Sequence, residues 1–154
     1  MKISFTGTQS GMKAFQKTEL SRLLTELKCA ELCNGACIGA DEEALLISIE
    51  AGIKIFHLFP SYIKPKQSSW VGIIGYTEGR YEKFKDDIQV KMEKEEAPLI
   101  RNKKIVDESS ILIACPKEHE HTLRSGTWAT IRYAWHKKKK VITIPPIERE
   151  NDLD

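Results

Sequence analysis

Three short segments of this sequence combine glycine with hydroxyl or amide side chains, a composition suited to holding phosphate or ribose. They are Gly7-Thr8-Gln9-Ser10-Gly11, residues 34–41 (NGACIGAD) and Ser125-Gly126-Thr127. Glycine lets the backbone approach a ligand closely, and unpaired N–H groups at the start of a helix attract phosphate. Each segment alone could be only a tight turn between a strand and a helix. Three of them at one edge of a sheet favour a phosphate or ribose site.

Arg124 is the side chain that we expect to contribute most to binding an anion. It lies two residues before Gly126, where a helix is predicted to begin. A guanidinium beside unpaired N–H groups can form charge-assisted hydrogen bonds with a phosphate or carboxylate. The alternative is that Arg124 pairs with Glu118 or Glu120 in its own loop. Trp128, in the same helix, could stack on a base or pack into the core.

Asp41, Arg101 and Asn102 are further polar candidates for the site. Asp41 could bind a ribose hydroxyl or orient a reacting group, or it could simply cap the helix that starts near it. Arg101 and Asn102 begin a short predicted helix and could reach a phosphate, and the alternative for them is a surface salt bridge. We include all three in the predicted site, with Asp41 as the candidate for catalysis.

Cysteine and histidine do not form a recognisable metal pattern. The four cysteines are Cys29, Cys33, Cys37 and Cys115. Three of them are spaced four residues apart, whereas zinc sites usually use a C-x₂-C pair with a second pair or histidines in register. His119 and His121 have no further ligand nearby in the sequence. We predict neither a metal site nor a cofactor, and we expect the cysteines to be free thiols in a reducing compartment.

The elements that must position these residues alternate between strand and helix. Hydrophobic patterning predicts strands over 2–6, 30–33, 53–59, 111–115 and 141–144, and helices over 12–28, 41–51, 99–107 and 126–136. This alternation predicts an α/β fold, Rossmann-like and doubly wound, with a mainly parallel five-stranded sheet. In such sheets ligands bind beyond the carboxyl ends of the strands, where the glycine segments are expected.

The chain is predicted to form one domain over residues 1–147. An excursion at about 61–96 interrupts it, and the charged part of this excursion, residues 80–96, reads as a surface excursion or a partly exposed helix. Connections of this length often act as lids. Residues 148–154 form an acidic tail that we expect to be frayed.

Charge and hydrophobic patterning indicate which partners and which location to expect for this protein. The 154 residues carry 24 basic and 22 acidic side chains, so we do not expect nucleic acid as a partner on charge alone. There is no apolar run near the roughly 20 residues that span a bilayer and no signal peptide, so we expect a cytoplasmic protein without membrane contact. Apolar side chains between Trp70 and Tyr76 predict a surface used in a homo-oligomer.

Several motifs, taken jointly and in order, resemble the SLOG superfamily, which joins the DprA/Smf proteins to the LOG proteins. They are Gly7-Thr8-Gln9-x-Gly11, residues 34–41, residues 101–107 (RNKKIVD), residues 111–116 (ILIACP) and residues 124–130 (RSGTWAT). The resemblance covers most of the chain outside residues 62–96. It implies a Rossmann-like fold, binding of nucleotides, nucleotide-derived signals or nucleic acid, and dimers or larger assemblies.

The resemblance leads to one favoured function and two alternatives. In LOG enzymes, which cleave the N-glycosidic bond of nucleoside monophosphates, a glutamate follows the glycine-threonine pair, and that position holds Thr130. We therefore favour a module that binds a nucleotide or nucleotide-derived signal, such as a cyclic nucleotide or an ADP-ribose derivative. The alternatives are a LOG-like phosphoribohydrolase or nucleoside transferase and a single-stranded nucleic-acid binding protein. The predicted ligand-binding residues are Gly7, Thr8, Gln9, Gly11, Gly35, Ala36, Cys37, Gly39, Asp41, Arg101, Asn102, Arg124, Ser125, Gly126 and Thr127.

Overall fold

The computed structural model describes residues 1–68, 81–83, 87–119, 121, 123 and 125–146. Its strands are β1 (Lys2–Gly7), β2 (Glu31–Asn34), β3 (Ile55–Leu58), β4 (Tyr81–Lys83), β5 (Gln89–Met92), β6 (Ile111–Cys115) and β7 (Lys140–Thr143). Its helices are α1 (Ala14–Glu26), α2 (Ala40–Glu50), the 3₁₀ helix η1 (Lys64–Lys66), α4 (Pro98–Asp107) and α5 (Gly126–His136). All four predicted α-helices are present, and the bounds of α5 coincide with those expected from the sequence.

One sheet contains all seven of these strands, in the order β4-β5-β3-β2-β1-β6-β7. Neighbouring strands from β5 to β7 are parallel, and only β4 is antiparallel, to β5. The predicted count of five strands was wrong because β4 and β5 lie in the charged segment that was expected to be an excursion. In β5, buried Val90 and Met92 alternate with half-buried Gln89 and Lys91, a pattern too short to stand out among the surrounding charges.

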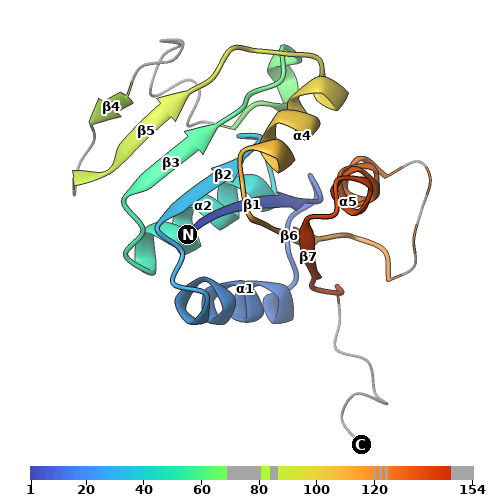
Figure 1. Cartoon of the computed structure of the whole chain (residues 1–154), viewed down its shortest axis with the longest axis horizontal. Helices are drawn as coiled ribbons and strands as arrows, with labels where there is room; N and C mark the ends of the chain where they lie inside the picture. The colour runs from blue at the N-terminus through green and yellow to red at the C-terminus, as the bar shows by residue number, and fades with distance from the viewer. Residues whose placement is uncertain (69–80, 84–86, 120, 122, 124, 147–154) are drawn as a thin grey trace, which may run out of the picture.

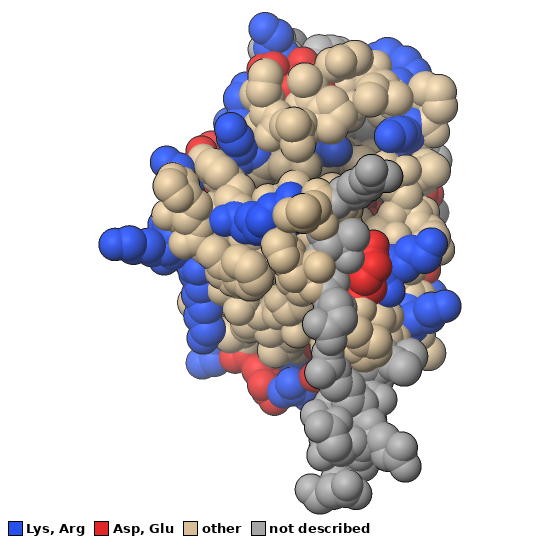
Figure 2. Space-filling model, turned by 90° about the vertical axis from the view of Figure 1, so that its right-hand side faces the viewer, with Lys and Arg blue, Asp and Glu red and all other residues tan. Residues whose placement is uncertain are grey.

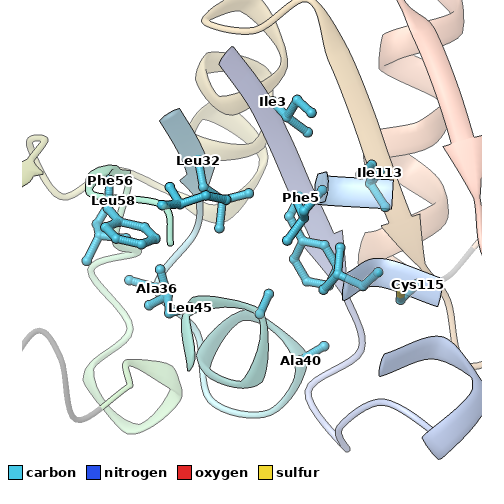
Figure 3. Packing of buried hydrophobic residues seen from close by; sticks show 14 of the residues in the cluster. Ile3, Phe5, Leu32, Ala36, Ala40, Leu45, Phe56, Leu58, Ile113 and Cys115 are labelled. Atoms are coloured by element: carbon cyan, nitrogen blue, oxygen red, sulfur yellow. The ribbon is translucent and has the colours of Figure 1, made fainter. Parts of the chain in front are cut away.

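Helices cover both faces of the sheet, as expected for a doubly wound fold. Helices α1 and α2 pack against each other, and α4 packs against α5 on the opposite face (Figure 1). Strand β6 shows the two-sided burial: Ile113 packs in the cluster with α1 and α2, whereas Leu112 packs with Trp128 of α5. Figure 3 shows the first of these clusters around Phe5 and Leu45. Burial on both faces explains the continuous apolar run of β6.

The loops that follow β1 and β2 are locked together at the carboxyl edge of the sheet. The N–H of Ala40 donates to the carbonyl of Thr8 at 3.0 Å. Gly39 has φ +82°, and a Cβ there would lie 2.2 Å from the carbonyl oxygen of Gln9. Only glycine tolerates both the conformation and the contact. The two glycine segments therefore meet, as their spacing from the strands predicted.

Among the described residues, no helix is long and apolar enough to cross a membrane.

Candidate functional site

A cavity of about 360 Å³ opens at the carboxyl edge of the sheet. From β1 the chain runs outward through β2, β3 and β5, and it then returns to place β6 and β7 on the other side of β1. The reversal between β1 and β6 creates the crevice in which open α/β sheets bind ligands. The cavity is lined by Phe5, Thr6, Gly7, Thr8, Gln9, Gly35, Cys37, Asp41, Lys66, Pro98, Leu99, Arg101, Asn102, Ile105, Lys117, Glu118, Ser125, Gly126 and Thr127. Its volume is within the range of small-molecule sites.

The loop after β2 is held in shape by two buried side chains. Asn34 accepts from the N–H of Ala36 at 3.0 Å and donates to the carbonyl of Asp41 at 3.0 Å. The Asp41 carboxylate accepts from the N–H of Cys37 at 3.2 Å. Helix α2 begins after Gly39, so the alternative that Asp41 only caps this helix was wrong. Asp41 instead binds the loop that precedes the helix.

Arg101 is buried, with 7% of its surface exposed, and it joins three parts of the site. Its Nη1 donates to the carbonyls of Gly35 at 2.8 Å and Phe59 at 3.4 Å and contacts Sγ of Cys37 at 3.2 Å. The alternative of a surface salt bridge was therefore wrong. Its Nε is buried and has no hydrogen-bond partner among the described residues. The guanidinium thus holds the loops together, and one of its donors has no partner among the described residues.

Gly35 is required by the position of Arg101. A Cβ at residue 35 would lie 2.3 Å from Nη1 of Arg101 and 3.1 Å from the Asp41 carboxylate. The absence of a side chain lets guanidinium and carboxylate approach the same stretch of backbone. Gly35 is therefore needed so that Arg101 can pack closely against the backbone, and not only to form a turn.

Burial raises the pKa of the Asp41 carboxyl to about 6. The positive charge of Arg101 and the N–H groups of Cys37 and Gly35 oppose this shift without cancelling it. A carboxyl group that titrates near neutral pH can hold or release a proton under ordinary conditions. Asp41 is accordingly the described cavity residue best suited to acid–base chemistry.

The start of α5 forms the opposite wall of the cavity. The Ser125 hydroxyl caps the helix by accepting from the N–H of Trp128 at 3.2 Å. The N–H groups of Gly126 and Thr127, the first two residues of the helix, have no acceptor within the helix. The Thr130 hydroxyl donates to the carbonyl of Gly126 at 3.0 Å and does not line the cavity. These features make the N-terminus of α5 suitable for an anion.

Three charged residues of the cavity were not among the predicted ligand-binding residues. Lys117 and Glu118 come after Pro116, the residue that follows β6, in a segment expected at the binding edge, although neither was named as a ligand-binding residue. Lys66 belongs to η1, which is held beside the loop after β2 because the N–H of Ile38 donates to the Lys66 carbonyl at 2.9 Å. Nothing in the local sequence around Lys66 indicates this contact.

Most of the predicted ligand-binding residues come together at this cavity. Those that line it are Gly7, Thr8, Gln9, Gly35, Cys37, Asp41, Arg101, Asn102, Ser125, Gly126 and Thr127. Ala36 and Gly39 lie in the same loop as Cys37 but do not line the cavity, and Gly11 lines a neighbouring one. Arg124 lies outside the described residues. Their roles in binding remain predictions, now attached to a definite cavity.

The cysteines show no sign of activation. All four are free, and Cys33, Cys37 and Cys115 are buried. Burial raises the pKa of the Cys37 thiol to about 11, although it contacts Arg101. A thiol with a raised pKa is a poor nucleophile at neutral pH. Within the described part of the chain, no group of three or more His, Cys, Asp or Glu side chains is arranged to hold a metal ion.

Comparison with solved structures identifies the fold, whereas no protein-family model and no curated protein sequence matches the chain. The molybdenum cofactor binding protein from the phototrophic bacterium Rippkaea orientalis has a TM-score of 0.63 at 17% identity, over 99% of this chain and 80% of that one. DNA processing protein A (DprA) from Streptococcus pneumoniae has a TM-score of 0.65 at 18% identity, over 97% of this chain and 52% of that one.

DprA from Helicobacter pylori, whose structure addresses its single-stranded DNA binding mode, has a TM-score of 0.59 at 18% identity, over 98% of this chain and 67% of that one. These structures all have SLOG-type folds. The chain shares that fold, as the order of its motifs indicated.

Proposed function

We propose that this chain, which has the SLOG-type fold, binds a nucleotide or nucleotide-derived molecule in the cavity between β1 and β6. The observation that carries the proposal is the buried guanidinium of Arg101, whose Nε lacks a partner among the described residues. Lys66, Lys117 and the N-terminus of α5 line the same cavity. Together these groups offer positive charge and N–H donors, which suit a phosphate.

Apolar side chains of α4 support a ligand with a flat ring as well as a phosphate. Pro98, Leu99 and Ile105 line the cavity, and Leu99 remains 65% exposed. An exposed leucine at the mouth of a charged cavity can cover the face of a base. A nucleotide combines both chemistries in one molecule. Among the solved structures named above, one protein binds a molybdenum cofactor and another binds single-stranded DNA, so ligand binding by proteins of this fold is consistent with the proposal.

Calorimetric titration with mononucleotides, cyclic nucleotides and ADP-ribose tests the proposal. Lys117→Ala removes one positive charge from the cavity wall, and we expect it to weaken binding about three- to tenfold, because a charge-assisted hydrogen bond contributes roughly 1 kcal/mol or more. Lys28→Ala is the matched control, since Lys28 is an exposed lysine after α1 that does not line the cavity. Absence of binding by every compound at millimolar concentration would refute the proposal.

Cleavage of the N-glycosidic bond is a second candidate function. It is favoured by the Asp41 carboxyl, which lines the cavity and whose pKa burial raises to about 6. A carboxylic acid that keeps its proton near neutral pH can protonate a leaving base. Chromatography after long incubation with nucleoside monophosphates would detect the free base. Release of base that is lost in Asp41→Asn would establish an enzyme rather than a binding module.

Single-stranded nucleic acid is a third candidate ligand, and the DprA structures support it despite the balanced net charge. On the side of α5 and β7, Lys and Arg side chains cover more of the surface than acids do (Figure 2). Lys137, Lys138 and Lys140 are exposed there. A gel shift with single-stranded DNA at low salt tests this candidate, and we expect any complex to weaken steeply as salt increases.

We also propose that the chain forms a homo-oligomer, on the basis of other apolar residues than those identified in the sequence. The apolar residues between Trp70 and Tyr76 that motivated it lie outside the described residues. The exposed Leu99, Ile100 and Trp135 side chains on α4 and α5 are apolar groups that an interface could cover. Light scattering at micromolar concentration would decide between monomer and oligomer.

A further inference from the structure

Glu118 lines the cavity, and one oxygen of its carboxylate has no hydrogen-bond donor among the described residues. Its Oε2 is buried, and no described residue donates a hydrogen bond to it. The Asp41 carboxylate differs, because it already accepts from the N–H of Cys37. A buried carboxylate oxygen without a donor is unfavourable, and a ligand that supplies a donor relieves that cost. Glu118 is therefore expected to accept from a bound molecule.

The other charged groups of the cavity define what this molecule must carry. Lys66, Lys117 and Arg101 offer donors and positive charge, which suit phosphate oxygens. A carboxylate repels phosphate and instead accepts from a neutral N–H or O–H group. The ligand must therefore present an anion to one part of the cavity and neutral donors to another. Two adjacent hydroxyl groups match the two oxygens of a single carboxylate.

We infer that Glu118 accepts hydrogen bonds from the vicinal 2′ and 3′ hydroxyls of ribose and so selects ribonucleotides over 2′-deoxyribonucleotides. The inference rests on the proposed nucleotide binding and adds to it the class of sugar. In a nucleotide the sugar joins the phosphate to the base. Glu118 shares its cavity with the N-terminus of α5, suited to the phosphate, and with Leu99 of α4, suited to the base. The donors that Glu118 lacks are those of the connecting sugar.

The test compares matched ribo- and deoxyribonucleotides on the full chain. Binding of adenosine and guanosine 5′-monophosphates and of their 2′-deoxy counterparts is measured by calorimetry. For the wild-type chain we expect about tenfold weaker binding of each deoxy compound, the cost of losing one hydrogen bond to a charged acceptor. In Glu118→Gln we expect the preference to fall below threefold, while deoxynucleotide affinity holds or rises because a negative charge is removed from the cavity.

Glu19→Gln is the matched control, because Glu19 is a glutamate on α1 that pairs with Arg22 and does not line the cavity. It should keep the tenfold preference. Equal binding of both sugars by the wild-type chain, or a preference unchanged in Glu118→Gln, would overturn the inference while leaving nucleotide binding intact. A preference that follows the base and ignores the sugar would overturn it as well. Failure of all four nucleotides to bind would instead overturn the proposed function.

Discussion

We expect Asp41 to make the stability of the fold depend on pH, and this dependence can be measured without knowing the ligand. Burial raises the pKa of this carboxyl from 3.8 to about 6. The folded chain therefore holds the proton more tightly than the unfolded chain. Its contribution to stability is complete below about pH 4 and is lost as pH rises through 6. A difference of about 2 units corresponds to about 3 kcal/mol in the free energy of unfolding.

Replacing the carboxyl by a neutral amide isolates this contribution from those of other groups. The amide introduced by Asp41→Asn has no proton to lose, so the difference in unfolding free energy between variant and wild type should change by about 2 kcal/mol in favour of the variant between pH 4 and pH 7. A constant offset from altered hydrogen bonds to Cys37 does not affect this change. Urea unfolding followed by circular dichroism at several pH values measures it.

Glu96→Gln is the control, because its pKa shift has the opposite sign. The hydrogen bond from Lys104 lowers the pKa of Glu96, so this carboxylate stabilises the fold at higher pH and the contribution is lost as pH falls. Glu96→Gln should therefore lose stability relative to wild type as pH rises. If the difference in unfolding free energy between Asp41→Asn and wild type stayed constant from pH 4 to pH 7, burial of the Asp41 carboxyl would not outweigh the charge of Arg101, and the prediction would be refuted.

Two further predictions concern the loops of the site. Gly35→Ala places a Cβ against Arg101 and should lower the unfolding free energy by about 1–3 kcal/mol and Tm by roughly 3–10 °C in a thermal melt. Gly126→Ala is the control and should change Tm little, because nothing lies within 4 Å of the added atom. Equal melting temperatures of the two variants would refute the packing argument. Arg124→Ala should weaken binding of an anionic nucleotide about tenfold in calorimetry with little change in Tm, and Arg124→Lys should restore only part of it, because lysine keeps the charge without the two-pronged donor. Unchanged affinity in Arg124→Ala would place the anion elsewhere.

The elements of this fold were largely predictable because their patterns are local. The alternation of helical and strand segments was enough to predict a doubly wound parallel sheet, and the continuous apolar run at Ile111–Cys115 marked a strand that is buried on both faces. Strand β5 escaped prediction, because its four residues are polar at every second position and the segment is held in the sheet by pairing with β3 and β4. Local pattern is weak evidence for an element that tertiary pairing stabilises.

The sequence by itself determined which glycine-containing loops meet at one edge of the sheet. Glycine, hydroxyl and amide residues directly after β1 and β2 and before α5 had to meet, because the carboxyl ends of parallel strands share one edge. Only the tertiary structure determined which charged side chains lie at that edge and how they are paired. Burial of Arg101 against Gly35, the entry of Lys66 from η1 and the unpaired oxygen of Glu118 each depend on contacts between segments far apart in the chain. Spacing within a sequence records neighbours along the backbone, whereas burial and pairing arise from neighbours in space.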